Sequence, residues 1–226
     1  MKLLFLGTGA ADWNIKSSVK DDEFRRYTST LVDDCLLIDP GPCVLEALNT
    51  FGADKNKIKF IINTHSHSDH YNTETVENLI QCGAEFIPFL SGEEKEIGKY
   101  KISAFPANHG TCEGAVHFII DDGNKKIFYG LDSAWLLYEE VQAIVKNHID
   151  LAVLDATIGD VPGDYRIFEH NNLNMVREIK LTLGKSVDRF IISHMARTLH
   201  TDHKTLSDLM AKDGIEVAYD GLELNI

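Results

Sequence analysis

The segment Thr64-His65-Ser66-His67-Ser68-Asp69-His70 carries the strongest chemical signal in the sequence. His65 and His67 are two residues apart, so in an extended segment their imidazoles project to the same side. Asp69 and His70 follow where the chain turns towards a helix, which lets them reach a second point nearby. Imidazole nitrogens and carboxylate oxygens are ligands that Zn²⁺ and similar ions prefer. The segment therefore predicts a metal site rather than a solvated polar turn.

Three later positions offer further ligands, each near the end of a predicted strand: His109, Asp132 and His194. His109 taken alone would be a surface histidine in a Pro/Asn/Gly loop, and Asp132 alone would be the cap of the helix that begins near Trp135. His194 follows the apolar run Phe190-Ile-Ile-Ser193, where an imidazole without a partner would be costly. This burial context favours a ligand role for His194, whereas the residues alone leave both interpretations open for His109 and Asp132.

With this series of motifs, HxHxDH followed by a histidine, an aspartate and a last histidine, the sequence resembles the metallo-β-lactamase-fold hydrolases over nearly its whole length. The resemblance implies an α/β protein, a four-layer αββα sandwich with two mixed β-sheets face to face and helices outside. It also implies two divalent metal ions per chain, with zinc first and manganese or iron as alternatives. One ion would be held by His65, His67 and His109 and the other by Asp69, His70 and His194, with Asp132 bridging them. Asp69 would then be a catalytic residue as well as a ligand.

His170 helps to indicate which branch of this family the sequence resembles most. It lies in Phe168-Glu169-His170-Asn171, just before a predicted helix and ahead of His194. A histidine at this place is similar to the phosphodiesterase branches, namely the cyclic phosphodiesterases of phosphonate breakdown and the tRNA 3′-end endonucleases, where it contacts the phosphate or serves the leaving group. The end of the chain, residues 214–224, also looks like the cyclic phosphodiesterase branch. The resemblance thus implies a phosphodiesterase for small phosphodiesters, cyclic ones included, with a hydroxide bridging the metals as nucleophile and His170 as a catalytic residue. The alternative is a helix-start histidine without substrate contact.

The sequence departs from that branch in two places. The stretch Ala10–Arg26 contains no cysteine, so the structural zinc knuckle often found there is not expected. His194 is followed by Met195-Ala196-Arg197, where the branch often has a second histidine, and this leaves the substrate open. A thioesterase or lactonase on the same metal site, and a non-catalytic metal-binding regulator, therefore remain alternatives.

Four more residues are candidates for supporting roles. Asp39, in Ile38-Asp39-Pro40-Gly41, matches a family turn beneath the site and would hold the second nitrogen of a ligand imidazole, or else form an ordinary Asp-Pro turn. Asp155 ends another buried strand and carries the same two readings. Arg25 or Arg26 is a candidate phosphate contact, with solvation as the alternative. The remaining histidines match no motif position and are interpreted as structural or solvated: His117, His148, His200 and His203.

Short apolar runs alternate with helical patterns along the chain, which predicts a single α/β domain over residues 1–226. Strands are predicted at Lys2–Leu6, Thr30–Asp39, Ile58–Thr64, Glu85–Phe89, Lys101–Pro106, Ala115–Asp121, Lys125–Leu131, Leu151–Ala156, Arg189–Ser193 and Glu216–Tyr219. Helices are predicted at Pro42–Phe51, Thr73–Cys82, Trp135–His148, Asn171–Leu183 and Thr201–Lys212. A hairpin is expected at Asp121–Asn124, and the polar stretch Ala10–Thr28, which includes Lys16 and Lys20, is expected to be a long functional loop.

The overall charge of the protein limits the kinds of molecule that it is expected to bind. With 22 Lys+Arg against 35 Asp+Glu, the net charge is −13, and such a surface repels polyanions, so a long nucleic-acid substrate is disfavoured. No apolar run is long enough for a membrane span, and the apolar start ends at Gly7, too early for a signal peptide. The four cysteines form no disulfide pattern, which favours a cytoplasmic protein. A small-molecule substrate is expected, and a homodimer only by analogy with the fold.

Overall fold

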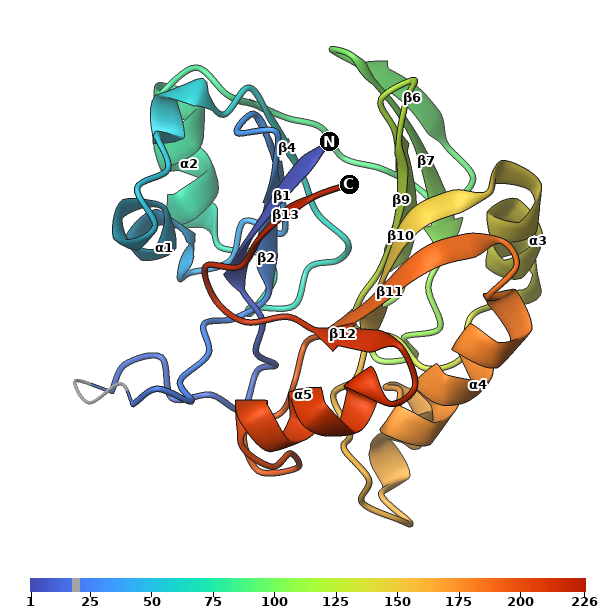
Figure 1. The fold of residues 1–226 in the computed structure, drawn as a ribbon. Helices are drawn as coiled ribbons and strands as arrows, with labels where there is room; N and C mark the ends of the chain where they lie inside the picture. Colours follow the sequence, from blue (N-terminus) through green and yellow to red (C-terminus); the bar gives the residue numbers. More distant parts are fainter. Residues whose placement is uncertain (18–20) are drawn as a thin grey trace.

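A computed structural model describes residues 1–17 and 21–226, and Figure 1 shows their arrangement. Two mixed β-sheets lie face to face in the middle of the molecule, and helices cover their outer sides. The four-layer αββα sandwich predicted from the sequence is therefore confirmed. Lys20, named above as part of a long loop, lies outside the described residues.

The first sheet has the strand order β13-β1-β2-β3-β4-β5. Strands β1, β2 and β13 pair antiparallel, whereas β3, β4 and β5 run parallel. Helices α1 (Val44–Thr50) and α2 (Thr73–Gln81) cover its outer face. The strands are β1 (Lys2–Gly7), β2 (Ser29–Val32), β3 (Leu36–Ile38), β4 (Phe60–Ile62), β5 (Glu85–Phe86) and β13 (Glu223–Asn225).

The second sheet has the order β12-β11-β10-β9-β8-β7-β6, parallel from β12 to β9 and antiparallel from β9 to β6. Helices α3 (Tyr138–Asn147), α4 (Leu173–Leu183) and α5 (His203–Ala211) lie outside it. The strands are β6 (Glu94–Ile97), β7 (Tyr100–Pro106), β8 (Val116–Asp121), β9 (Lys126–Gly130), β10 (Ile149–Asp155), β11 (Val187–Ser193) and β12 (Ile215–Val217). Two short 3₁₀ turns, η1 (Lys55–Lys57) and η2 (Tyr165–Phe168), complete the described elements.

Apolar side chains fill the space between the two sheets and the space beneath the helices. Ile38 and Ile62 of the first sheet pack in the central layer together with Ile102 and Val153 of the second, and all four are fully buried. Separate apolar clusters join α1 to the first sheet and α4 to the second. Because these layers are continuous, the ends of the strands are held in fixed positions relative to each other.

One predicted strand is wrong. Thr30–Asp39 is not a single strand but the hairpin of β2 and β3, which pair antiparallel with Val32 opposite Leu36. The chain reverses at Asp33 and Asp34, whose φ angles of 47° and 59° are left-handed. Aspartate tolerates this conformation better than most residues, so the turn forms inside a run that looks continuous in the sequence.

The other predicted helices and strands correspond to observed ones with ends shifted by a few residues, whereas β6 and β13 were not predicted. In the part of the chain that the structure describes, no helix combines the length and the apolar character that crossing a bilayer requires.

Candidate metal centre

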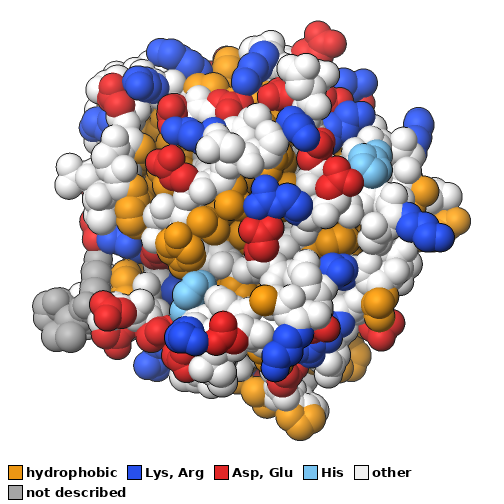
Figure 2. Space-filling view, viewed as in Figure 1, with side chains coloured by type: hydrophobic (Ala, Val, Ile, Leu, Met, Phe, Trp, Pro, Cys, Tyr) orange, Lys and Arg blue, Asp and Glu red, His pale blue; other side chains and the backbone are white. Residues whose placement is uncertain are grey.

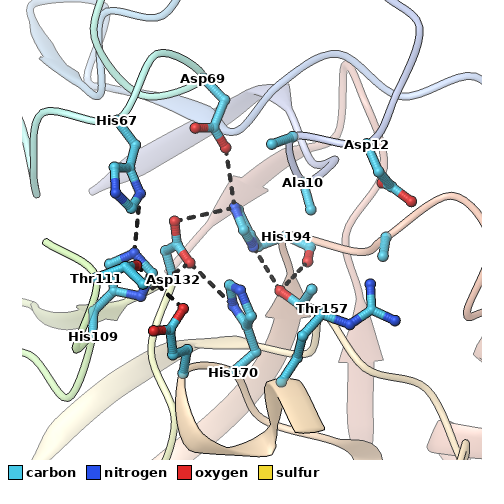
Figure 3. A pocket seen from close by; sticks show the side chains of 14 residues that line it. Ala10, Asp12, His67, Asp69, His109, Thr111, Asp132, Thr157, His170 and His194 are labelled. Atoms are coloured by element: carbon cyan, nitrogen blue, oxygen red, sulfur yellow. Dashed lines mark hydrogen bonds and ion pairs between the residues drawn. The ribbon is translucent and has the colours of Figure 1, made fainter. Parts of the chain in front are cut away.

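The seven predicted ligands come from both sheets and meet beyond the ends of the strands that carry them. Figure 3 shows the part of this centre around Asp132 and His194. The segment after β4 carries four of them, and the other three follow β7, β9 and β11. In α/β proteins, ligands bind beyond the carboxyl ends of parallel strands, where loops from several strands converge. The seven are His65, His67, Asp69, His70, His109, Asp132 and His194.

A first cluster brings together His65, His67, His109 and Asp132, with one nitrogen or oxygen atom of each within 4.8 Å of the others. Nε2 of His109 lies 3.1 Å from Nδ1 of His67. Nε2 of His65 lies 3.1 Å from Oδ2 of Asp132. The spacing of two within HxH thus places both imidazoles on one side, as the extended segment predicts.

A second cluster brings together Asp69, His70, Asp132 and His194. Nε2 of His70 lies 3.1 Å from Nε2 of His194. Oδ2 of Asp132 lies 3.2 Å from the first of these nitrogens and 3.6 Å from the second. Asp132 therefore belongs to both clusters, which is the position that the bridging role requires.

Asp39 holds the second nitrogen of His70. Its Oδ2 lies 3.0 Å from His70 Nδ1, while its Oδ1 accepts hydrogen bonds from the backbone nitrogen and the hydroxyl of Thr64 at 2.7 and 2.9 Å. The Thr64 hydroxyl in turn lies 2.9 Å from Nδ1 of His65. A single buried carboxylate thus orients two imidazoles, and of the two readings given for Asp39 the structure supports the holding of a ligand.

Asp155 makes the same arrangement on the second sheet. Its Oδ2 lies 3.2 Å from Nδ1 of His194 and accepts a hydrogen bond from the Thr157 hydroxyl at 2.8 Å. Its Oδ1 accepts from the backbone nitrogens of Thr157 and Asn171. Sequence reasoning missed the two threonines, although each stands near a strand end, next to His65 in one case and two residues after Asp155 in the other.

The donor set fits divalent metal ions. Nδ1 of both His70 and His194 faces a carboxylate, so in the neutral imidazoles Nδ1 carries the hydrogen and the lone pairs of Nε2 converge at 3.1 Å. A cation among these atoms relieves the repulsion. Nε2 of His65 and Oδ1 of Asp132 are buried and form no hydrogen bond with a described residue, although each lies 3.1 Å from an ionisable neighbour, Asp132 and His170 respectively. Mixed imidazole and carboxylate ligands suit Zn²⁺, and also Mn²⁺ or Fe²⁺.

The pKa values show where positive charge is attracted. Burial, with help from His70, lowers the pKa of His65 to about 4, so this imidazole is neutral at pH 7 and keeps a lone pair. Burial alone would also lower the pKa of His194, but the carboxylates of Asp132 and Asp155 outweigh it and raise the pKa to about 9. The second cluster therefore draws positive charge strongly, which a divalent ion can supply.

Three residues of the site have left-handed backbone conformations: Asp39 (φ 61°), Asp132 (φ 59°) and His194 (φ 61°). This conformation costs an L-residue roughly 1–2 kcal/mol. All three are almost fully buried, and each stands directly after a strand or one residue beyond it. The sheets therefore hold these side chains at the centre in spite of local strain, as is common at functional sites.

His170 lies beside the two clusters, in the segment that leads from η2 into α4. Its Nδ1 is 3.1 Å from Oδ1 of Asp132 and 3.4 Å from Oδ2 of Asp155. Burial alone would lower the pKa of His170, but these two carboxylates raise it to about 10. Nε2 makes no hydrogen bond with any described residue, and Figure 3 shows the ring next to Asp132 and His194.

A cavity of about 240 Å³ opens over the centre. His67, His109 and His170 line it, together with four side chains that sequence reasoning did not single out: Asp12, Thr111, Arg166 and Glu169. The only signal for the last two is that they lie one turn or less before His170.

Arg25 and Arg26 do not line the cavity. Arg25 donates to the Thr8 hydroxyl and the Ala218 carbonyl, and Arg26 pairs with Asp220. Both arginines are buried, so neither is solvated and neither faces the candidate centre.

The four histidines outside the motifs also lie away from the cavity. His117 is fully buried against Glu140 and the carbonyl of Leu131, and His148 is an exposed partner of Asp188. The other two, His200 and His203, contact backbone carbonyls and Arg25 respectively. Their interpretation as structural or solvated residues is consistent with these positions.

Comparison with known proteins agrees with this geometry. Residues 23–72 match the family model of the Metallo-beta-lactamase superfamily, a segment that includes Asp39 and the HxHxDH motif. No curated protein sequence matches the chain.

Solved structures match over the whole chain. A diphosphatase from the PhnP family has a TM-score of 0.73 at 20% identity, covering 100% of this chain and 97% of the other. The Zn²⁺-bound PqqB from Methylobacterium extorquens has a TM-score of 0.75 at 14% identity and 100% coverage of both chains. The short form of human tRNase Z has a TM-score of 0.73 at 15% identity, covering 100% and 99%. These likenesses confirm the resemblance to the metallo-β-lactamase fold.

Proposed function

From the metallo-β-lactamase fold and its paired His/Asp clusters, we propose that the protein is a metal-dependent hydrolase and, more finely, a phosphodiesterase for small phosphodiesters. The observation that carries the finer proposal is His170, whose Nδ1 lies 3.1 Å from Asp132 in the same cavity as the candidate ligands. Its Nε2 forms no hydrogen bond within the described part of the chain, so it is well placed to contact a substrate there.

The ligand roles follow from the two clusters. His65, His67 and His109 would hold one ion, Asp69, His70 and His194 the other, and Asp132 would contact both. Bound divalent ions polarise a phosphoryl oxygen, neutralise the charge that develops at phosphorus and make a water molecule nucleophilic at neutral pH. Asp39 and Asp155 fix the orientation of the two imidazoles that close the second cluster.

Hydrolysis adds one water molecule across a P–O ester bond. The water oxygen bonds to phosphorus, the ester bond breaks, and the departing oxygen takes a proton. His170 is the candidate donor, because its Nε2 forms no hydrogen bond with a described residue while its Nδ1 faces the carboxylates of Asp132 and Asp155. Anchoring Nδ1 also fixes the direction of the ring, so the proton would be delivered at a defined point.

The size and charge of the molecule support a small substrate. The cavity of about 240 Å³ is slightly smaller than the ~300–1,000 Å³ of typical small-molecule sites. On the face drawn in Figure 2, leaving aside its grey atoms, basic and acidic side chains are interspersed rather than gathered into a basic track. Such a track is what binding of a long phosphate backbone requires. Among the structural neighbours, one is named a diphosphatase and another a tRNase.

The test is hydrolysis of bis(p-nitrophenyl) phosphate by purified protein whose bound metal has been quantified. We expect turnover that requires two ions per chain and disappears in Asp69→Ala, because this change removes a candidate ligand. The matched control is Asp188→Ala, which removes an exposed carboxylate far from both clusters and should keep the wild-type rate.

The possible outcomes test the phosphodiesterase proposal and the broader proposal of a metal-dependent hydrolase separately. A protein that binds two ions and leaves the diester intact would contradict the phosphodiesterase proposal, and thioesters and lactones would be the next substrates to assay. A protein that binds no divalent ion would contradict the metal-dependent hydrolase as well.

A further inference from the structure

Among the described residues that line the cavity, Arg166 is the only lysine or arginine. It lies in η2, between β10 and α4, and its side chain is 34% exposed. The cavity also holds the carboxylates of Asp12 and Glu169, so a cation here is not simply part of a general basic surface.

Asp164 fixes the guanidinium in place. Its Oδ1 accepts hydrogen bonds from the backbone nitrogen and Nε of Arg166 at 2.9 and 2.8 Å, and its Oδ2 accepts from Nη2 at 2.5 Å. Within the described part of the chain, Nη1 has no hydrogen bond. Two N–H groups are therefore available at a position that is already ordered, which reduces the entropy lost when they bind a ligand.

The backbone ties Arg166 to the candidate catalytic histidine. The carbonyl oxygen of Arg166 accepts hydrogen bonds from the backbone nitrogens of Glu169 and His170 at 2.9 and 2.8 Å. Glu169 also accepts from the Thr111 hydroxyl at 3.2 Å, which links this turn to the loop that carries His109. The guanidinium is thus held at a constant place relative to the centre.

Arg166 does not itself contact the candidate ligands. Among the described residues it forms no ion pair or hydrogen bond with any of the seven, and its side chain pairs with Asp164. An anionic group bound at the two clusters would therefore leave Nη1 unsatisfied, and a second anionic group on the same molecule would satisfy it.

We propose that Arg166 forms a second oxyanion subsite, so that the preferred substrates carry a phosphate or carboxylate group in addition to the scissile diester. The proposal rests on the proposed function for the position of that diester. Planar N–H donors of arginine match the oxygens of phosphate and carboxylate groups. The nearby carboxylates of Asp12 and Glu169 oppose an anion, but Asp12 accepts hydrogen bonds from the backbone nitrogen of Arg197 and Glu169 from Thr111.

The test measures binding rather than turnover. Calorimetry on the metal-loaded protein would compare alkyl monophosphates with α,ω-alkanediol bisphosphates of two to six carbons and with the matching ω-phosphoalkanoates. Varying the chain length covers the unknown distance between the two anionic groups. Comparing the bisphosphates with the phosphoalkanoates distinguishes phosphate from carboxylate as the second group. A charged hydrogen bond contributes about 1.5–3 kcal/mol, so the best spacing should bind about 10–150-fold tighter than its monophosphate.

Three variants test whether Arg166 causes the tighter binding of ligands with two anionic groups. Arg166→Ala should reduce the advantage of the second group to less than about twofold, and Arg166→Lys should keep part of it because the charge remains. The matched control is Arg189→Ala: Arg189 is 36% exposed, donates Nε and Nη2 to Glu216 at 2.9 and 3.0 Å, and lies outside the cavity. This control should keep the full advantage.

An unchanged advantage in both Arg166 variants, or no advantage for the wild type at any length, would overturn the subsite. Thermal unfolding of each variant shows that a loss of binding is not a loss of fold. A protein that binds the second group through Arg166 and yet leaves bis(p-nitrophenyl) phosphate intact would contradict the proposed reaction while supporting the subsite.

Discussion

Asp39→Asn isolates the effect of holding one ligand imidazole. In the structure, Oδ1 of Asp39 accepts two hydrogen bonds from Thr64, and Oδ2 faces Nδ1 of His70 at 3.0 Å. An asparagine must keep its oxygen towards the Thr64 donors, so its NH₂ group faces His70 Nδ1. Two donors then oppose each other unless His70 moves its hydrogen to Nε2. That shift removes the lone pair through which His70 would bind a metal ion.

The expected loss can be given a size. Removing the hydrogen-bond partner of a metal-ligating histidine typically weakens metal affinity about 10–100-fold, which is about 1.4–2.7 kcal/mol. Asp39 reaches the first cluster only through Thr64, whose hydroxyl contacts His65. We expect the loss at the second cluster alone, because the asparagine oxygen keeps its hydrogen bonds to Thr64 and so preserves that contact. The first ion should bind as in the wild type.

The assay is competition for Zn²⁺ with a fluorescent chelator, which resolves the two affinities. Asp220→Asn is the matched control: the side chain of Asp220 is only 8% exposed, and it also accepts from a backbone nitrogen, that of Arg26, and from a threonine hydroxyl, that of Thr8. Among the described residues, no imidazole forms a hydrogen bond or an ion pair with Asp220. Unchanged affinity in Asp39→Asn, or an equal loss in both variants, would refute the reasoning.

Three further changes have defined outcomes. His170→Ala should reduce turnover of bis(p-nitrophenyl) phosphate about 10²–10⁴-fold with unchanged metal content, whereas the exposed His148→Ala should leave turnover unchanged; undiminished turnover would remove the role of His170. Gly41→Ala places a Cβ 2.3 Å from the carbonyl oxygen of Asp69, so unfolding should cost about 1–3 kcal/mol less and metal should bind more weakly, measured by denaturant titration and metal analysis. Gly110→Ala, whose Cβ would lie 3.9 Å from its nearest neighbour, is the control that should keep both values. Chelation of the metal should lower the melting temperature by about 5–10 °C, because an ion at about a hundred times its Kd stabilises by about 2.7 kcal/mol; an identical melting temperature with and without chelator would contradict metal binding by the folded state.

The parts of the fold that bury apolar runs could be predicted from the sequence. Strands β4 and β11 stand out because each is an apolar run with a histidine within three residues of its end, and the structure places His65 and His194 at the same centre. The edge strand β6, Glu94–Ile97, could not be found in this way. Its residues are mostly polar because an edge strand buries little, and charged side chains protect its free edge.

In the candidate site, too, some features could be predicted from the sequence and others could not. Ligand types and their order are properties of the sequence, so all seven candidates could be named before the structure. The direction of a long side chain depends on tertiary packing, which explains why Arg25 and Arg26 were considered as phosphate contacts while Arg166 was not. Likewise, the contact between Asp39 and His70 joins residues on different segments, and the sequence alone left two readings open.

The second cluster has a topological consequence. His70 and His194 are 124 positions apart in the sequence and come from different sheets, so an ion that binds both closes a long loop in the chain. If the ion stayed bound while the chain unfolded, the loop would restrict the unfolded chain as a disulfide of similar span does, by about 4–5 kcal/mol in the chain-entropy model. If the ion were released before unfolding, the unfolded chain would keep its full conformational entropy. The order of the two events therefore sets whether the unfolding rate depends on the concentration of free metal.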